Sequence, residues 1–403
     1  MALPVGLSRG TLDHSTSLRS PGAASRGEKA PYDSATTTAP QSSVAAAIAP
    51  RSFVWTEKFD ATLLVAPMVL GLLAAAFVTS NPAWYAAVVL ADLWFLGYHH
   101  VVSTYTRLGF SSKSLLRNRV LAIYLLLAIV LATTALAFTA GAWVVASAFL
   151  YLQWFHYMRQ GYGISRMYFR TTSHGQAAGA RDLLANLVIY VVPVYAIAHR
   201  STTMGDMFLA MPVKTLAPPA VVVTTLGVAA ALVVAAWFVR LGHRVAVGTA
   251  DVRYEGFILS HVVIFLCGYI LIVDANVGWL AINIWHNLQY VLVVWMVNVK
   301  RYAGRTDADE PLLSRISQPG RPIAYFVCCL AITTLVYLGL NQFTVLVMGG
   351  GLAATLGIYM GINFHHYIVD ALIWKRRAAL PPKGGSHGTS GGSHGTPPAA
   401  VAA

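Results

Sequence analysis

Charged side chains are scarce in this chain of 403 residues, where Asp, Glu, Lys and Arg together make up only 11%. A typical soluble domain carries about 25%. Apolar residues make up 57%, and they gather in repeated runs that are long enough to cross a bilayer. The shortage of charge together with these runs excludes an ordinary soluble domain and predicts a multi-pass membrane protein.

Cysteine is also scarce. The three cysteines, Cys267, Cys328 and Cys329, all lie in apolar segments, and adjacent residues such as Cys328 and Cys329 are poor disulfide partners. No CxxC pair is present, so the sequence gives no sign of a disulfide framework, a thiolate zinc site or an iron–sulfur cluster. We interpret the three thiols as small buried hydrophobic side chains.

Acidic residues are the rarer charge, with 15 Asp and Glu against 28 Lys and Arg, which gives a formal net charge of +13. A basic balance of this size is also found in nucleic-acid-binding proteins. Here, however, the basic residues lie mainly in short segments beside the apolar runs, where the positive-inside rule accounts for them. We therefore expect no nucleic-acid partner.

The chain divides into three regions by composition. Residues 1–56 are rich in Ser, Ala, Thr and Pro without apolar periodicity, which predicts a disordered cytoplasmic leader. Because the residues near Met1 include no apolar stretch, we do not expect a cleaved signal peptide. Residues 57–378 form the predicted transmembrane helical domain. Residues 379–403 contain the segment GGSHGT twice, which predicts a disordered Gly/Ser/His tail.

The predicted fold class is all-α, a polytopic bundle of about ten transmembrane helices. The expected spans are 61–80, 83–105, 119–140, 142–160, 182–199, 219–240, 256–275, 278–299, 322–341 and 343–374. Lys and Arg follow every second span, and the alternate loops carry almost none apart from Arg200 and Lys214. This pattern predicts that both termini are cytoplasmic, in an integral protein of a bacterial inner membrane.

Histidines inside the spans are the feature that a plain bundle does not explain. An imidazole in hydrocarbon is costly unless it has a partner, so such residues are functional candidates. At about 1.5 Å rise per residue most of them fall near the cytoplasmic edge, and His286 lies deepest, roughly 20 Å in. We predict a metal site in the membrane, with seven candidate ligands: His99, His100, His156, His261, His286, His365 and His366.

Two carboxylates and one tyrosine accompany these histidines. Asp92 precedes His99 by seven residues, which places both on nearly the same helical face, and Asp370 follows His366 by four. Each carboxylate can bind the metal directly or hold an imidazole from behind. Tyr290 shares a helical face with the predicted ligand four residues before it and can supply a hydrogen bond. We predict catalytic roles for Asp92, Asp370 and Tyr290.

Histidine with few carboxylates suits zinc, copper or iron, and an iron site of imidazoles, with one or two ions, keeps positions open for O₂. With paired histidines at helix ends, the region from about 60 to 376 resembles the histidine-rich membrane oxygenases, and the resemblance rests on His99-His100, His156, His286 and His365-His366. These include fatty-acid desaturases and hydroxylases and the Brp/Blh-type carotene-cleaving dioxygenases. The chain lacks the HxxxH and HxxHH motifs of desaturases and is closer to the carotene-cleaving type, whose iron is held by histidines dispersed over many helices.

The resemblance implies a non-haem iron oxidoreductase that takes a lipid or isoprenoid-like substrate from the membrane, with an electron donor that the sequence does not identify. Three other hypotheses remain open. Two histidines on facing helices could ligate haem. The His–Asp pairs could relay protons or metal ions in a transporter, in which Gly349–Gly351 could break the last span. The bundle could also be a scaffold without catalysis.

Overall fold

The computed structural model describes residues 55–108, 110–175 and 180–373. Of the predicted leader, only residues 55 and 56 are described, and the predicted tail, 379–403, lies outside the described residues. The first helix begins at Glu57, and the last described helix ends at Ile373. Between them the described chain is almost entirely helical, which confirms the predicted all-α class.

Eight helices within the described residues are long and apolar enough to cross a membrane, which makes the chain a multi-pass membrane protein by length and composition. Five of them are single α-helices, and three are composite segments that each contain one π-helical turn. The single helices are α1 (Glu57–Ser80), α7 (Leu183–Thr203), α8 (Ala220–Ala246), α10 (Ala275–Tyr302) and α12 (Pro322–Met348). The first composite segment, Pro82–Leu108, consists of η2 (Pro82–Trp84), α2 (Tyr85–Asp92), η3 (Leu93–Gly97) and α3 (Tyr98–Leu108). The second, Val120–Thr139, consists of η4 (Val120–Tyr124) and α5 (Leu125–Thr139), and the third, Val252–Leu271, consists of α9 (Val252–Leu266) and η6 (Cys267–Leu271).

Two further long helices, α6 (Ala142–Phe169) and α13 (Leu352–Ile373), occupy the positions of the fourth and tenth predicted spans. Neither is among the eight helices that are apolar enough to count as candidate spans. The remaining elements are short: α4 (Ser112–Arg117), η5 (Ser173–Gly175), α11 (Pro311–Ile316) and a hairpin of β1 (Met207–Phe208) and β2 (Met211–Pro212). The sequence analysis anticipated none of these short elements.

Local sequence signals set several helix ends. The side chain of Asp274 accepts hydrogen bonds from the amides of Asn276 (2.8 Å) and Val277 (3.0 Å) and so caps the start of α10. Gly349 and Gly350 have positive φ angles of 76° and 69°, a conformation that favours glycine and ends α12. The predicted span at 343–374 is therefore wrong at its start, because these glycines form the turn between two helices and α13 begins only at Leu352.

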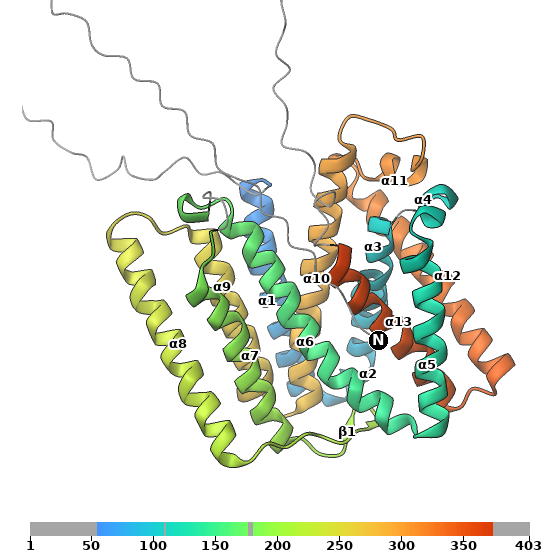
Figure 1. Ribbon diagram of the computed structural model, residues 1–403, viewed down its shortest axis with the longest axis horizontal. Helices are drawn as coiled ribbons and strands as arrows, with labels where there is room; N and C mark the ends of the chain where they lie inside the picture. The colour runs from blue at the N-terminus through green and yellow to red at the C-terminus, as the bar shows by residue number, and fades with distance from the viewer. Residues whose placement is uncertain (1–54, 109, 176–179, 374–403) are drawn as a thin grey trace, which may run out of the picture. The chain divides into compact units, whose positions relative to one another are not determined.

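Helix α10 occupies the centre of the bundle. Its most apolar 18-residue window is 78% buried, against 11% for α8, which faces outward along most of its length. Helices α1 and α3 pack on α10, α7 packs on α8, and α13 lies between α5 and α6 (Figure 1). Every side chain on α10 that enters the interior can therefore meet residues from several other helices.

Small residues allow the tightest helix contacts. A Cβ atom at Gly71 of α1 would lie 2.3 Å from the carbonyl oxygen of Ala281 on α10, so only glycine permits this approach. Gly357 and Gly361, one helical turn apart on α13, meet the backbone of α5 at Thr134 and Val130 in the same way. Such spacing of small residues is typical of helix pairs in membranes.

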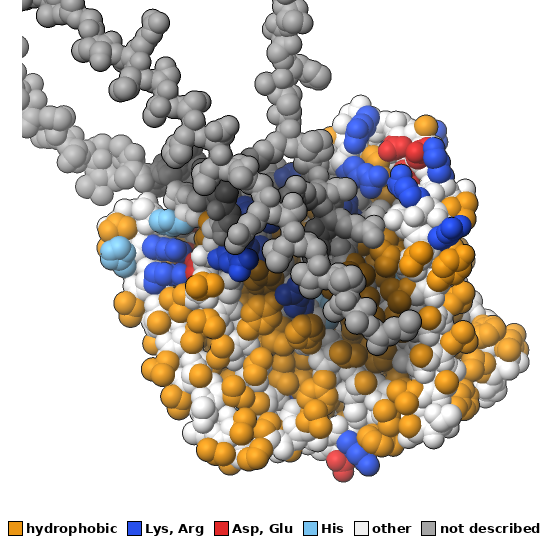
Figure 2. Space-filling model, in the orientation of Figure 1, with side chains coloured by type: hydrophobic (Ala, Val, Ile, Leu, Met, Phe, Trp, Pro, Cys, Tyr) orange, Lys and Arg blue, Asp and Glu red, His pale blue; other side chains and the backbone are white. Residues whose placement is uncertain are grey.

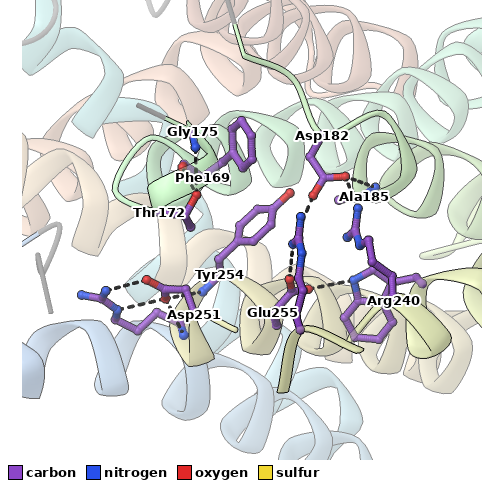
Figure 3. A network of polar contacts seen from close by, with 12 residues as sticks. Phe169, Thr172, Gly175, Asp182, Ala185, Arg240, Asp251, Tyr254 and Glu255 are labelled. Carbon is purple, nitrogen blue, oxygen red and sulfur yellow. Dashed lines mark hydrogen bonds and ion pairs between the residues drawn. The ribbon is translucent and has the colours of Figure 1, made fainter. Parts of the chain in front are cut away.

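Basic side chains gather on one end of the visible face, and apolar side chains cover most of the remainder (Figure 2). At this end the termini of α7, α8 and α9 are joined by ion pairs (Figure 3). Asp182 accepts from Arg240, and Arg244 lies 2.6 Å from Glu255. Burial alone would raise the pKa of Asp182, but hydrogen bonds from the Ala185 amide and from Arg240 outweigh it and lower that pKa. The pairs therefore tie three helix ends together.

Candidate metal centre

Four histidines from four different helices converge in the interior of the bundle. His100 lies on α3, His156 on α6, His286 on α10 and His366 on α13, and all four are buried. The ring centroid of His286 lies 4.8 Å from that of His100 and 4.9 Å from that of His156. The ring of His366 lies 4.6 Å and 4.9 Å from the same two rings. Four of the seven predicted ligands thus meet at one place.

The nitrogen atoms of three of these histidines are close enough to hold a metal ion. Nε2 of His366 lies 2.7 Å from Nε2 of His100 and 3.2 Å from Nε2 of His156. One ring nitrogen offers either one N–H or one lone pair, so two such contacts at one atom are poorly served by hydrogen bonding alone. Nitrogen ligands at ~2.0–2.1 Å from a shared ion lie roughly 2.9–3.4 Å apart. The 3.2 Å distance falls within this range and the 2.7 Å distance is slightly shorter, and the ligand atoms of His100, His156 and His366 all lie within 4.8 Å of one another.

The ring of His286 lies beside this group of three, although His286 is not one of the residues whose ligand atoms lie within 4.8 Å of one another. Nδ1 of His286 is buried and has no hydrogen-bond partner among the described residues. The backbone carbonyl of His286 accepts a 2.8 Å hydrogen bond from Nε2 of Gln160, which joins α10 to α6 beside the cluster. A donor set of four imidazoles suits iron, zinc or copper. It is also sufficient for a single ion with open positions.

A chain of hydrogen bonds holds the ring of His366 from behind. Its Nδ1 lies 2.8 Å from Oγ1 of Thr104, which lies 2.9 Å from the hydroxyl of Tyr290. That hydroxyl donates to Oδ1 of Asp370. Such contacts fix the orientation of a metal-binding imidazole and the nitrogen that remains for the metal. Tyr290 and Asp370 therefore lie beside the cluster as predicted, and Asp370 is reached through the tyrosine.

A π-helical turn changes the face on which Asp92 lies. The turn at Leu93–Gly97 adds one residue to the helix between Asp92 and the histidine pair. Asp92 consequently lines up with His100, eight residues later, and the predicted alignment with His99 is wrong. Oδ2 of Asp92 accepts a 2.6 Å hydrogen bond from Asn283, whose Oδ1 accepts a 2.7 Å bond from Tyr157.

This second series of hydrogen bonds also ends at the cluster, because the ring of Tyr157 lies 4.3 Å from that of His286. Asp92 is thus two residues removed from the nearest imidazole. It supports the residues around the cluster, and its carboxylate does not adjoin the cluster nitrogens.

In each adjacent histidine pair, only one ring reaches the cluster. His99 points to α12, where its ring meets that of Phe326 edge to face at 5.3 Å. His365 has both ring nitrogens occupied, with Nδ1 3.0 Å from the hydroxyl of Tyr105 and Nε2 2.7 Å from the carbonyl oxygen of Leu121. Consecutive residues on a helix point about 100° apart, so a ligand and its neighbour face different partners. The expectation that both members of each pair bind the metal is not met.

His261 also lies apart from the cluster. Its Nε2 is 3.1 Å from the carbonyl oxygen of Ile189, and its ring contacts those of Phe265 and Trp285. The ring fills the space above Gly161, where a Cβ atom would come within 2.6 Å of Cε1. His261 is therefore a packing residue between α6, α7, α9 and α10, and its predicted role as an extra ligand is not supported.

A cavity of about 960 Å³ opens beside the cluster, between α6 and α13 and over α10. His156, Tyr290 and Asp370 form its polar inner end. Apolar side chains line its flank, and two of them, Phe155 and Ile368, are 53% and 43% exposed on the outer surface of the bundle. The cavity therefore connects the histidine cluster with the apolar exterior.

A smaller cavity of about 210 Å³ is lined by all four clustered histidines. Leu209 and Met211 of the β-hairpin segment also line it, and His156 and Tyr367 border both cavities. The hairpin is held in place by Phe208, whose ring lies 5.8 Å from that of Trp279. All four clustered histidines therefore line the smaller cavity, and His156 also lines the larger one.

Sequence reasoning missed Thr104. It lies four residues after His100, on the same helical face, so a search for polar residues one turn from each candidate ligand finds it. Its contact with His366 on α13 cannot be found in this way, because the spacing of residues along one helix does not show which residues of another helix they contact.

Comparison with protein-family models, with curated proteins and with solved structures gave no match.

Proposed function

We propose that this protein is a membrane-embedded oxidoreductase with a single histidine-bound metal ion, iron being the best fit, that acts on a hydrophobic substrate from the bilayer. The observation that carries the proposal is the convergence of His100, His156, His286 and His366 beside a large cavity with apolar, outward-facing walls. Imidazole nitrogens at 2.7 Å and 3.2 Å suit a shared ion, and the cavity suits a long apolar molecule.

Iron held by imidazoles with open positions supplies the ability to bind and activate dioxygen. The protein's own residues supply the rest. Thr104 holds the ring of His366, and Tyr290 links that hydroxyl to Asp370 at the cavity wall. Protons can therefore move between the cavity and the cluster along three side chains. Phe155 and Phe364 contribute apolar surface to the cavity that would hold the substrate.

With dioxygen as the oxidant, addition of both oxygen atoms across a substrate double bond, with cleavage to two carbonyl groups, balances without further electrons. Insertion of one oxygen atom into a C–H bond instead needs two electrons and two protons from a donor to reduce the second atom to water. The first reaction is the one that we propose, because it requires only the substrate and dioxygen.

The proposed topology has ten spans, eight of them apolar and two, α6 and α13, with polar inner faces. The end that carries most Lys and Arg side chains is proposed to be cytoplasmic, with both termini on that side, in a bacterial inner membrane (Figure 2). The distribution of Lys and Arg is then the one expected from the positive-inside rule.

The test is metal analysis and an absorption spectrum of the detergent-purified protein, together with dioxygen uptake on mixed membrane lipids. We expect about one metal ion per chain and no haem Soret band. His286→Ala should lose the metal, and His261→Ala, on a neighbouring helix and outside the cluster, should keep it. A wild-type protein without bound metal, or equal metal in both variants, would refute the proposal.

One observation favours a second candidate, translocation of metal ions. The cluster borders two cavities, so an ion could pass from one to the other through the histidines. Metal uptake into proteoliposomes that contain the protein would support this candidate, and metal that stays bound without flux would count against it. Haem is less compatible, because a flat macrocycle needs space between its two axial ligands, and ring centroids at 4.6–4.9 Å leave none.

A further inference from the structure

Four arginines line the same large cavity as the inner polar residues. Arg159 and Arg166 belong to the C-terminal half of α6, Arg170 caps its C-terminus, and Arg181 precedes α7. The first three lie seven and four residues apart, so they follow one face of the helix. Asp370 is the one carboxylate that the described lining contains. The cavity is therefore apolar along its flank and cationic toward the end of α6.

These arginines have no ion-pair partner within the part of the chain that the structure describes. The neighbouring arginines of α8 and α9 behave differently: Arg240 and Arg244 pair with Asp182 and Glu255, and Arg253 pairs with Asp251 (Figure 3). The same end of the bundle thus contains one neutralised group of arginines and one group that retains its charge. The charge that is retained faces the cavity.

Hydrogen bonds to one side chain and to one backbone carbonyl hold two of the cavity arginines in place. Arg159 donates a 2.7 Å hydrogen bond to the hydroxyl of Tyr190, and Arg166 donates a 3.0 Å bond to the carbonyl oxygen of Ala180. The guanidinium of Arg166 also lies 5.1 Å from the ring centroid of Phe169. Its Nη1 is buried and has no hydrogen-bond partner among the described residues. A guanidinium fixed in this way is prepared to receive an anion.

We propose that the cavity takes a single-chain amphiphile with an anionic carboxylate or phosphate headgroup, whose headgroup binds at Arg166 and Arg170 and whose chain extends to the histidine cluster. The proposal rests on the proposed function, because it names the substrate class of that site. Arg166 and Arg170 follow His156 by ten and fourteen residues, which is ~15 Å and ~21 Å along the helix. The reacting carbons are then far from the headgroup.

Arginines at a helix end also serve as topology anchors. An anchor extends its guanidinium into water or to lipid phosphates and needs no cavity. The partly buried position of Arg166 and its unsatisfied Nη1 distinguish this residue from an anchor, and Arg170, although exposed, lines the same cavity. Arg117, an exposed arginine of α4 outside the cavity lining, provides the comparison.

The experiment measures binding of three probes with the same sixteen-carbon chain to the purified full-length protein in detergent: hexadecanoate, hexadecyl phosphate and hexadecanol. We expect both anions to bind about 10- to 100-fold more tightly than the alcohol. The double variant Arg166→Gln/Arg170→Gln should lose this preference and keep its affinity for hexadecanol and its metal content. Arg117→Gln should keep the preference.

Equal binding of the three probes, or a preference that survives in the double variant or falls equally in Arg117→Gln, would overturn the proposal. If only one of the two anions is preferred, that result assigns the headgroup. His366→Ala separates this proposal from the proposed function: we expect it to lose metal and to retain the preference for anions. A wild-type protein that holds no metal and still prefers the anions through these arginines would refute the proposed function alone.

Discussion

Alanine substitutions at His365 and His366 are expected to have opposite effects, although the two residues are adjacent. His366 supplies the Nε2 that lies 2.7 Å and 3.2 Å from two other imidazole nitrogens, so its loss removes a central ligand. Removal of a residue that only orients a ligand costs 10- to 100-fold in metal affinity. We therefore expect His366→Ala to weaken binding by at least about 100-fold and the protein to be purified with almost no metal.

His365→Ala should instead destabilise the fold and leave the metal in place. The substitution leaves the hydroxyl of Tyr105 and the carbonyl oxygen of Leu121 without their imidazole partner. An unsatisfied buried polar group costs about 1–3 kcal/mol. The unfolding temperature should fall in His365→Ala, and the ratio of metal to protein should stay at the wild-type value.

The assay combines elemental analysis of the dialysed, detergent-purified variants with thermal unfolding followed by tryptophan fluorescence. Size-exclusion chromatography shows whether each variant is a single folded species. The pair His99→Ala and His100→Ala repeats the experiment on α3, with metal loss expected only for His100. Equal metal loss in both members of a pair, or full metal content in His366→Ala, would refute the reasoning.

Three further predictions concern the support of the site and of the helices. Thr104→Val should weaken metal binding by about 10- to 100-fold in a metal titration, and an unchanged affinity would show that the hydroxyl does not orient the ring. Because the pKa of Asp182 is lower in the folded protein than its unfolded value of about 3.9, its stabilising effect is present above about pH 4 and is lost as the pH falls through the folded pKa. Thermal unfolding of Asp182→Asn should therefore lack this acid-dependent loss, and an unchanged pH profile would contradict it. Gly71→Ala brings a Cβ atom to 2.3 Å from the carbonyl oxygen of Ala281 and should lower the free energy of unfolding by about 1–3 kcal/mol, whereas Gly242→Ala, which meets open space, should not.

The helices could be predicted from the sequence because each long apolar run carries its own signal. Apolar length gave the α1 and α8 regions to within a few residues at most ends, and the positions of the ten long helical segments agree with the expected spans. The errors lie where a local conformation decides. Gly349 and Gly350 turn the chain between two apolar segments, and short elements such as the β-hairpin have too few residues to produce a periodic pattern.

The site could be predicted only in part, because the spacing of residues along one helix does not show which face of that helix contacts another helix. The sequence indicated that histidines would meet and included the four that do. It could not choose between the two members of each adjacent pair. The π-helical turn at Leu93–Gly97 also rotates the residues after it, so Asp92 aligns with His100 and not with His99. The ring of His286, which was expected to lie deeper in the membrane than the other histidines, nevertheless lies within the cluster.

The division of polar residues among the helices follows from the position of the site. Helix α10 is mostly buried, so its Asn283 and His286 find partners on other helices and never face lipid. Helices α6 and α13 border the cavity, and each gives one face to polar residues and the other to the exterior. This is why these two fall outside the set of apolar candidate spans, while the outer helices α8 and α12 are within it. A long helix that is less apolar than its neighbours in such a bundle is therefore a useful first indication of where the cavity lies.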